Sequence, residues 1–153
     1  MKKYAVLIIS LFVLVGCSTR EEDSKYAYLE YKSNLEKQTE FTNDEGLEFN
    51  TFFNIERKSE EEVKYSLVID KPKNNMHHVK ALLVHDYSSD TAFPSVGIFD
   101  ESRELTSNSN DKIELSGIIN SAEDISSTNF KLYLEYDNDM GISNKIYYEV
   151  KRG

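Results

Sequence analysis

The stretch that decides the fold is Phe130-Lys131-Leu132-Tyr133-Leu134-Glu135-Tyr136-Asp137. Its even positions hold phenylalanine, leucine and tyrosine, whereas three of its four odd positions are charged and the fourth is Tyr133. Successive side chains of a strand point to opposite faces, so this alternation predicts an antiparallel strand with one face on a core. The residues that follow, 138–141, predict a hairpin turn in which Gly141 supplies a positive φ.

The same period of two continues through most of the chain after Gly46. It predicts seven strands, at 47–55, 63–69, 79–84, 96–99, 113–119, 130–137 and 146–150. The run at 79–84 is apolar on both faces except for Lys80, which predicts a central place in a sheet. A glycine inside a strand is typical of a β-bulge, and Gly117 therefore predicts one in the fifth strand.

Seven strands joined by polar turns favour an all-β fold, with a single antiparallel β-sandwich over residues 47–153. The size and the strand count are immunoglobulin-like. The likeness is one of architecture alone, because the chain has one cysteine and no tryptophan and so lacks the Cys…Trp…Cys signature. The alternative is a small lipocalin-like barrel, which would need an eighth strand.

The segment before the sandwich divides into two parts. Residues 18–24 are polar, have nothing to bury and are predicted to form a tether. Within 25–46, Tyr28, Tyr31 and Leu35 recur at spacings of three and four, which predicts a short helix with an aromatic stripe. An extended tether over 25–46 is the alternative, and the polar residues 43–46 predict a turn.

The first seventeen residues have the pattern of an export signal. Lys2 and Lys3 precede an apolar run over residues 5–15, which is about half the ~20 residues needed to cross a bilayer. The run ends in Leu14-Val15-Gly16-Cys17, which resembles the lipobox of bacterial lipoproteins. The resemblance implies that residues 1–16 are a signal peptide and that Cys17 is acylated through its sulfur. Residues 17–24 would then be the lipid anchor and tether, on the extracytoplasmic face of a cell membrane.

The charge balance limits the partners of the chain. The formal net charge is −9, from 27 acidic and 18 basic residues. Loss of Lys2 and Lys3 with a signal peptide would make it more acidic still. Nucleic-acid binding needs clustered lysine and arginine, so it is not expected here.

No pattern predicts a catalytic residue, a metal ligand or a cofactor. His77 and His78 are adjacent and would point to opposite faces of a strand, while His85 would lie about 26 Å from His77 along it. Residues 137–141 begin like a calcium loop, but the later positions of that loop do not match. Because the sequence also has no G-x-S-x-G nucleophile motif, an enzyme is not predicted.

Tyrosine side chains are the remaining indication of a binding surface in the sequence. Tyr133 and Tyr147 are expected to point outward from neighbouring strands, and Tyr28 and Tyr31 lie shortly after the tether; tyrosine is enriched at binding interfaces. These four are the candidate interaction residues. The alternative is that the N-terminal helix packs across this face and covers the rings.

The predicted function is a membrane-anchored, non-catalytic protein-interaction module of the accessory, envelope or exclusion and immunity type. Its expected partners are membrane lipid, through Cys17, and an envelope protein. A small-ligand carrier with a barrel or sandwich cavity is the alternative, although the inward Phe, Leu, Tyr and Ile of the strands would fill such a cavity.

Overall fold

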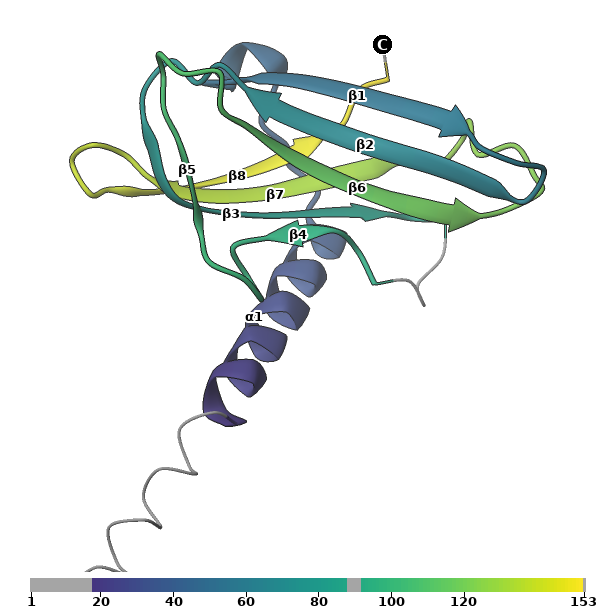
Figure 1. Cartoon of the computed structure of the whole chain (residues 1–153), viewed down its shortest axis with the longest axis horizontal. Helices are drawn as coiled ribbons and strands as arrows, with labels where there is room; N and C mark the ends of the chain where they lie inside the picture. The colour runs from purple at the N-terminus through teal and green to yellow at the C-terminus, as the bar shows by residue number, and fades with distance from the viewer. Residues whose placement is uncertain (1–17, 88–91, 153) are drawn as a thin grey trace, which may run out of the picture.

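A computed structural model of the chain describes residues 18–87 and 92–152 (Figure 1). The predicted signal peptide and Cys17, the predicted site of acylation, lie outside the described residues. One α-helix, α1 (Ser18–Lys37), and a 3-10 turn (Asp44–Gly46) precede the strands. The strands are β1 (Asn50–Arg57), β2 (Glu62–Asp70), β3 (Met76–His85), β4 (Ser95–Val96), β5 (Arg103–Leu105), β6 (Lys112–Asn120), β7 (Phe130–Asp137) and β8 (Ser143–Glu149).

The strands form two antiparallel sheets that face each other, as the β-sandwich prediction required (Figure 1). One sheet has the order β1-β2-β6, and the other has the order β4-β3-β7-β8 with β5 also paired to β3. The chain therefore crosses between the two sheets several times, as the strands of a β-sandwich do. The described strands do not close into a barrel, so the lipocalin-like alternative is wrong.

Sequence and structure differ on short strands and on Gly117. Over the described residues the structure has eight strands rather than the seven predicted, because β5 consists of three residues and is too short to show a period of two. Gly117 is not at a bulge, since it pairs in regular register with Tyr65. A Cβ atom on Gly117 would lie 2.3 Å from the Tyr65 hydroxyl oxygen, so the glycine makes room for the phenol ring.

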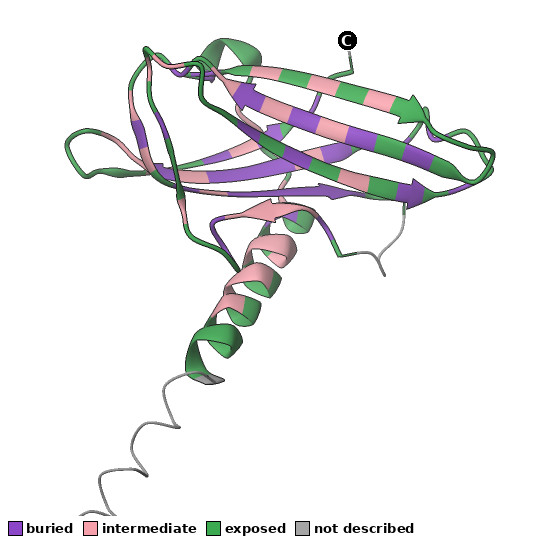
Figure 2. Cartoon of the chain, viewed as in Figure 1, coloured by how far each residue is buried: buried purple, intermediate pink, exposed green. Residues whose placement is uncertain are grey.

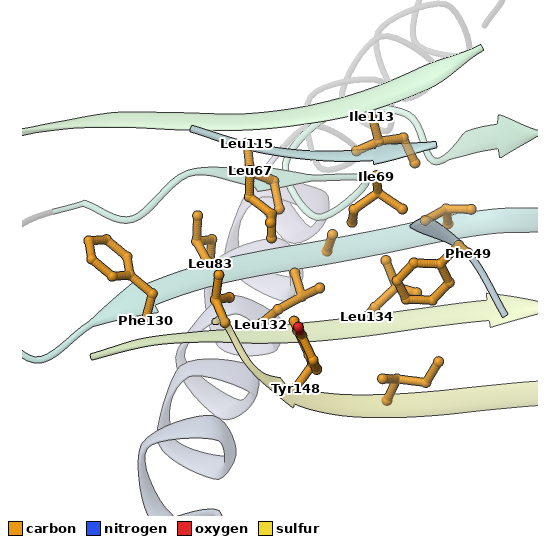
Figure 3. Packing of buried hydrophobic residues seen from close by; sticks show 14 of the residues in the cluster. Phe49, Leu67, Ile69, Leu83, Ile113, Leu115, Phe130, Leu132, Leu134 and Tyr148 are labelled. Atoms are coloured by element: carbon orange, nitrogen blue, oxygen red, sulfur yellow. The ribbon is translucent and has the colours of Figure 1, made fainter. Parts of the chain in front are cut away.

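The core lies between the sheets and is filled by large side chains from their inner faces (Figure 3). Tyr65, Phe130 and Leu132 are each at most 1% exposed. β3 is buried on both faces, as predicted: Leu83 packs in this core, whereas Leu82 packs on the opposite side of the sheet, toward α1. Burial on both faces explains why residues 81–84 of β3 are continuously apolar rather than alternating.

Helix α1 begins earlier than the sequence predicted. Residues 18–24, expected to be a tether, are helical, and so are most of the residues of the predicted short helix. The sequence of α1 contains no glycine or proline, and it places Glu21 in the first turn and Lys37 in the last, where their charges favour the helix dipole. Seven helical residues span about 10 Å, against about 25 Å when extended.

The two halves of α1 have different surroundings. Its N-terminal half projects from the body with mostly exposed residues, whereas its C-terminal half lies against the β3-β7-β8 sheet (Figure 2). Among the described helices, none combines the length and the apolar character required to cross a membrane. After Lys37 the chain continues along β8, where the Thr42 backbone N–H donates to the Tyr147 carbonyl.

Candidate functional site

The four candidate tyrosines meet at the interface between α1 and the outer face of the second sheet. Tyr133 on β7 lies directly opposite Tyr147 on β8, and their ring centroids are 5.5 Å apart. Tyr31 of α1 stacks on Tyr133 with a centroid distance of 4.5 Å and an interplanar angle of 21°. The Tyr28 hydroxyl accepts a hydrogen bond of 2.9 Å from the backbone N–H of Phe93.

Around these rings is a second hydrophobic cluster, separate from the core between the sheets. We call it the helix–sheet cluster; its buried members are Leu35, Leu82, Val84, Phe93, Ile98 and Tyr133, with Tyr28, Tyr31 and Tyr147 packed against them. Among the buried members, Leu35 comes from α1, and its side chain is fully buried. A helix with this stripe needs an apolar surface to cover, and the outward residues of β3 and β7 provide it.

The helix therefore covers the face, which was the alternative prediction. Tyr133, taken as an outward interaction residue, is 1% exposed and is not available to a partner. The physical reason is that β7 belongs to a sheet covered on both sides, so its second face is also buried. The spacing of Tyr28, Tyr31 and Leu35 signalled a buried helix face, but it did not identify the surface that buries it.

A polar network completes the interface. The Tyr133 hydroxyl donates to the Glu135 carboxylate. The ammonium nitrogens of Lys80 and Lys145 lie 3.8 and 4.0 Å from oxygens of that carboxylate. Burial, and then the hydrogen bond to Glu135, raise the pKa of Tyr133, and burial also raises the pKa of Tyr31. Both phenols stay protonated, so Tyr133 acts as a hydrogen-bond donor that fixes the interface rather than as a base.

A cation also links the helix to the segment before β4. Lys32 pairs with Glu36 one turn later, at 3.0 Å between ammonium nitrogen and carboxylate oxygen. The same ammonium lies 5.6 Å from the centre of the Phe93 ring. The docked half of α1 is thus held by apolar, hydrogen-bonding and cation–π contacts together.

The residues weighed for metal binding lie apart. His77 and His85 are at opposite ends of β3. Within the described part of the chain, no group of three or more His, Cys, Asp or Glu side chains is arranged to hold a metal ion. The calcium-like stretch at 137–141 is part of a hairpin, and Gly141 has a φ of 74°, as a turn requires.

His85 is the one histidine inside the fold. It is 5% exposed and sits among the rings of Tyr65, Phe93 and Phe130, with centroid distances of 5.3, 4.9 and 5.6 Å. Neither ring nitrogen has a hydrogen-bond partner among the described residues. Burial lowers the pKa of His85, so the imidazole is neutral and packs as an aromatic ring.

The surface has open recesses. One of about 680 Å³ lies between the edge strand β1 and the C-terminal residues, and it is lined in part by Phe49, Thr51 and Tyr148. Asp44 in this recess is bound by the Lys151 ammonium at 2.6 Å and by the Tyr148 hydroxyl at 2.9 Å. Asp44 and Lys151 thus form an ion pair within this recess.

Comparison of the chain with protein-family models, with curated proteins and with solved structures finds no match in any of the three.

Proposed function

We propose that this chain is a lipoprotein, anchored through Cys17 on the extracytoplasmic face of a cell membrane, whose β-sandwich is a non-catalytic protein-interaction module. The lipobox-type residues at 14–17 support the anchor. The absence of a nucleophile motif from the sequence favours binding over catalysis.

The observation that carries the proposal is the position of α1. The described part of this helix starts at Ser18, next to the proposed lipid-bearing cysteine, and its C-terminal half is docked on the sandwich. Twenty helical residues span about 30 Å. In this proposal the undocked half of α1 acts as a stiff stalk between the anchor and the sandwich, and it restricts the height and the orientation of the sandwich above the lipid. Such tethering confines a partner to the membrane plane and raises its effective concentration.

The partner-binding surface must lie away from the helix–sheet cluster. In Figure 1 the three-stranded sheet is on the side of the sandwich opposite to α1. Phe52 of β1 is 67% exposed on this sheet, and Met140 at the tip of the β7–β8 hairpin is 79% exposed. The excess of acidic residues favours an envelope protein with a basic contact surface as the partner.

A small-ligand carrier is the weaker function for this fold. The space between the two sheets is filled by side chains such as Tyr65, Leu67 and Phe130, all at most 1% exposed. A ligand cavity of the usual kind would need several hundred Å³ of enclosed space at that place.

Two measurements test the anchor and the partner. Metabolic labelling with palmitate should mark the wild-type protein and leave Cys17→Ser unlabelled and released from the membrane fraction. Photo-crosslinking residues introduced at Phe52 and at Met140 should then capture an envelope protein only in the anchored form. Equal labelling of wild type and Cys17→Ser would overturn the anchor, and capture unchanged by Cys17→Ser would overturn the tethering mechanism.

A flexible linker in place of the undocked half of α1 tests whether the stiffness of the stalk matters. Replacing residues 19–26 by glycine and serine keeps the anchor and the docked half of α1 but makes the connection flexible. If a fixed orientation matters, palmitate labelling stays and capture from Phe52 declines. Capture at the wild-type level would show that a flexible tether serves as well.

A further inference from the structure

His77 and His78 lie where β3 departs from regular pairing. The registers of β3 with β5 and with β7 both shift at this point, and His78 has a positive φ of 52°. The His77 ring lies between two carboxylates. Its Nδ1 is 2.5 Å from Oε2 of Glu104, and its Nε2 is 2.9 Å from Oδ1 of Asp139.

The number of protons on this ring decides whether both contacts can exist. An ionised carboxylate only accepts hydrogen bonds, and a neutral imidazole carries a single N–H. Both contacts of His77 are therefore hydrogen bonds only when the ring is an imidazolium. Removal of one proton leaves a nitrogen lone pair facing a carboxylate oxygen, which is repulsive, and one of the two contacts must open.

The two carboxylates come from elements that are otherwise separate. Glu104 is in β5, which is paired to β3, and its other oxygen accepts a hydrogen bond from the His78 backbone N–H at 3.0 Å. Asp139 is in the hairpin loop between β7 and β8, and its further side-chain contact is with the Asn75 amide at 3.1 Å. Each carboxylate thus has one partner besides His77, a backbone N–H for Glu104 and a side-chain amide for Asp139, and a side-chain partner can move with the loop.

The charged groups facing His77 from each packed element favour the proton. They are Glu104 from β5, Asp139 from the hairpin loop and Asp137 from β7, with His78 beside it on β3. An oxygen of the Asp137 carboxylate lies 3.1 Å from His78 Nδ1. Arg103, which precedes Glu104 on β5, pairs with Asp100, at 3.6 Å between guanidinium nitrogen and carboxylate oxygen. Hydrogen bonds to Asp139 and then to Glu104 raise the pKa of His77, and the pKa values of both carboxyls are lowered.

We propose that His77 is a pH-operated latch, which as an imidazolium ties the β7–β8 hairpin loop and β5 together across β3, and as a neutral imidazole releases Asp139 and its loop. That loop presents Met140 and Ile142, whose side chains are 79% and 54% exposed. The latch therefore controls how an apolar tip of the molecule is presented. It is closed below the raised pKa of His77, as long as the carboxyls remain ionised, and it opens as the pH rises through that pKa.

The test uses the full chain in detergent, with NMR titration of the His77 ring and amide-exchange protection in the loop. The amides of Met140 and Ile142 report the loop, since both donate to Oδ1 of Asn138. Their protection, corrected for the intrinsic exchange rate, should fall at the same pH at which the His77 ring loses its proton.

Three variants make the result decisive. Asp139→Asn should shift the His77 titration to lower pH and remove the step in loop protection. His77→Gln, which cannot carry the charge, should show the low-protection loop at every pH. His78→Asn is the matched control, because asparagine tolerates the positive φ and leaves the two His77 contacts in place; the step should remain. Amide-exchange protection of the loop that does not change as the His77 ring loses its proton would overturn the latch. Protection in His77→Gln equal to that of the wild type would overturn it as well.

Discussion

Replacing Leu35 with alanine is the sharpest test of the docked stalk. Leu35 is fully buried in the helix–sheet cluster, near the C-terminal end of α1. Burying a leucine side chain contributes about 1.5–3 kcal/mol, and buried Leu→Ala substitutions cost about 2–5 kcal/mol once the cavity is included. Because Leu35 is close to the end of the helix, its neighbours can partly close the gap. We therefore expect a loss of about 2–3 kcal/mol in the free energy of unfolding.

The assay is urea unfolding followed by circular dichroism, together with limited proteolysis of α1. The same helix offers a matched control in Leu29→Ala, because Leu29 is 49% exposed. Both substitutions change helix propensity equally, so the difference between them isolates the docking contact. Leu29→Ala should stay within about 0.5 kcal/mol of wild type. Cleavage within α1 should become faster in Leu35→Ala alone.

Two results would refute this reasoning. If Leu35→Ala and Leu29→Ala lose the same stability, the contact of Leu35 with the sheet contributes nothing. If α1 is cleaved as fast in wild type as in Leu35→Ala, the helix is not docked in solution. Either result would mean that the segment before the sandwich is the flexible tether that its charged residues suggested.

Three further predictions concern single residues. Burial lowers the pKa of His85 in the folded state. The buried neutral imidazole therefore contributes stability above the ordinary pKa of 6.5, and this contribution is lost as the pH falls through the folded-state pKa. His85→Phe should flatten the acid side of a stability–pH curve, and an unchanged curve would contradict this. Gly117→Ala would clash with the Tyr65 ring and should cost about 1–3 kcal/mol by thermal unfolding, partly relieved by Tyr65→Phe; a neutral effect would show that the ring moves freely. A Cβ atom on Gly141 would meet no neighbour within 4 Å, so only the φ of 74° opposes Gly141→Ala. We expect Gly141→Ala to lose about 1–2 kcal/mol in the free energy of unfolding, and Gly141→Asn to lose less.

The strands that could be predicted are those whose pattern is local. β2 and β7 alternate over at least eight residues, and burial follows that alternation except at Tyr133, which α1 covers. β5 could not be predicted, since three residues carry no period and its pairing partner lies more than 20 residues away on β3. The early start of α1 was missed for a related reason, because charged residues at 18–24 fit a solvated helix as well as a tether.

The candidate site was predictable in part. The stripe of Tyr28, Tyr31 and Leu35 indicated a helix with one apolar face. Tyr133 and Tyr147 were expected to lie on the same face of neighbouring strands, and the register places them directly opposite each other. The His77 contacts had no sequence signal, since Glu104 and Asp139 are 27 and 62 residues away along the chain.

By itself, the sequence determined the sandwich, because a period of two and a buried central strand are properties of short segments and of the hydrophobic effect acting on them. It also contains the lipobox-like residues 14–17, on which the proposed anchor at Cys17 rests. Only the tertiary structure decided which faces remain free. Whether Tyr133 meets solvent or α1, and whether His77 meets one carboxylate or two, depends on segments that are distant in sequence and are brought together only by packing of the helix, the sheets and the hairpin.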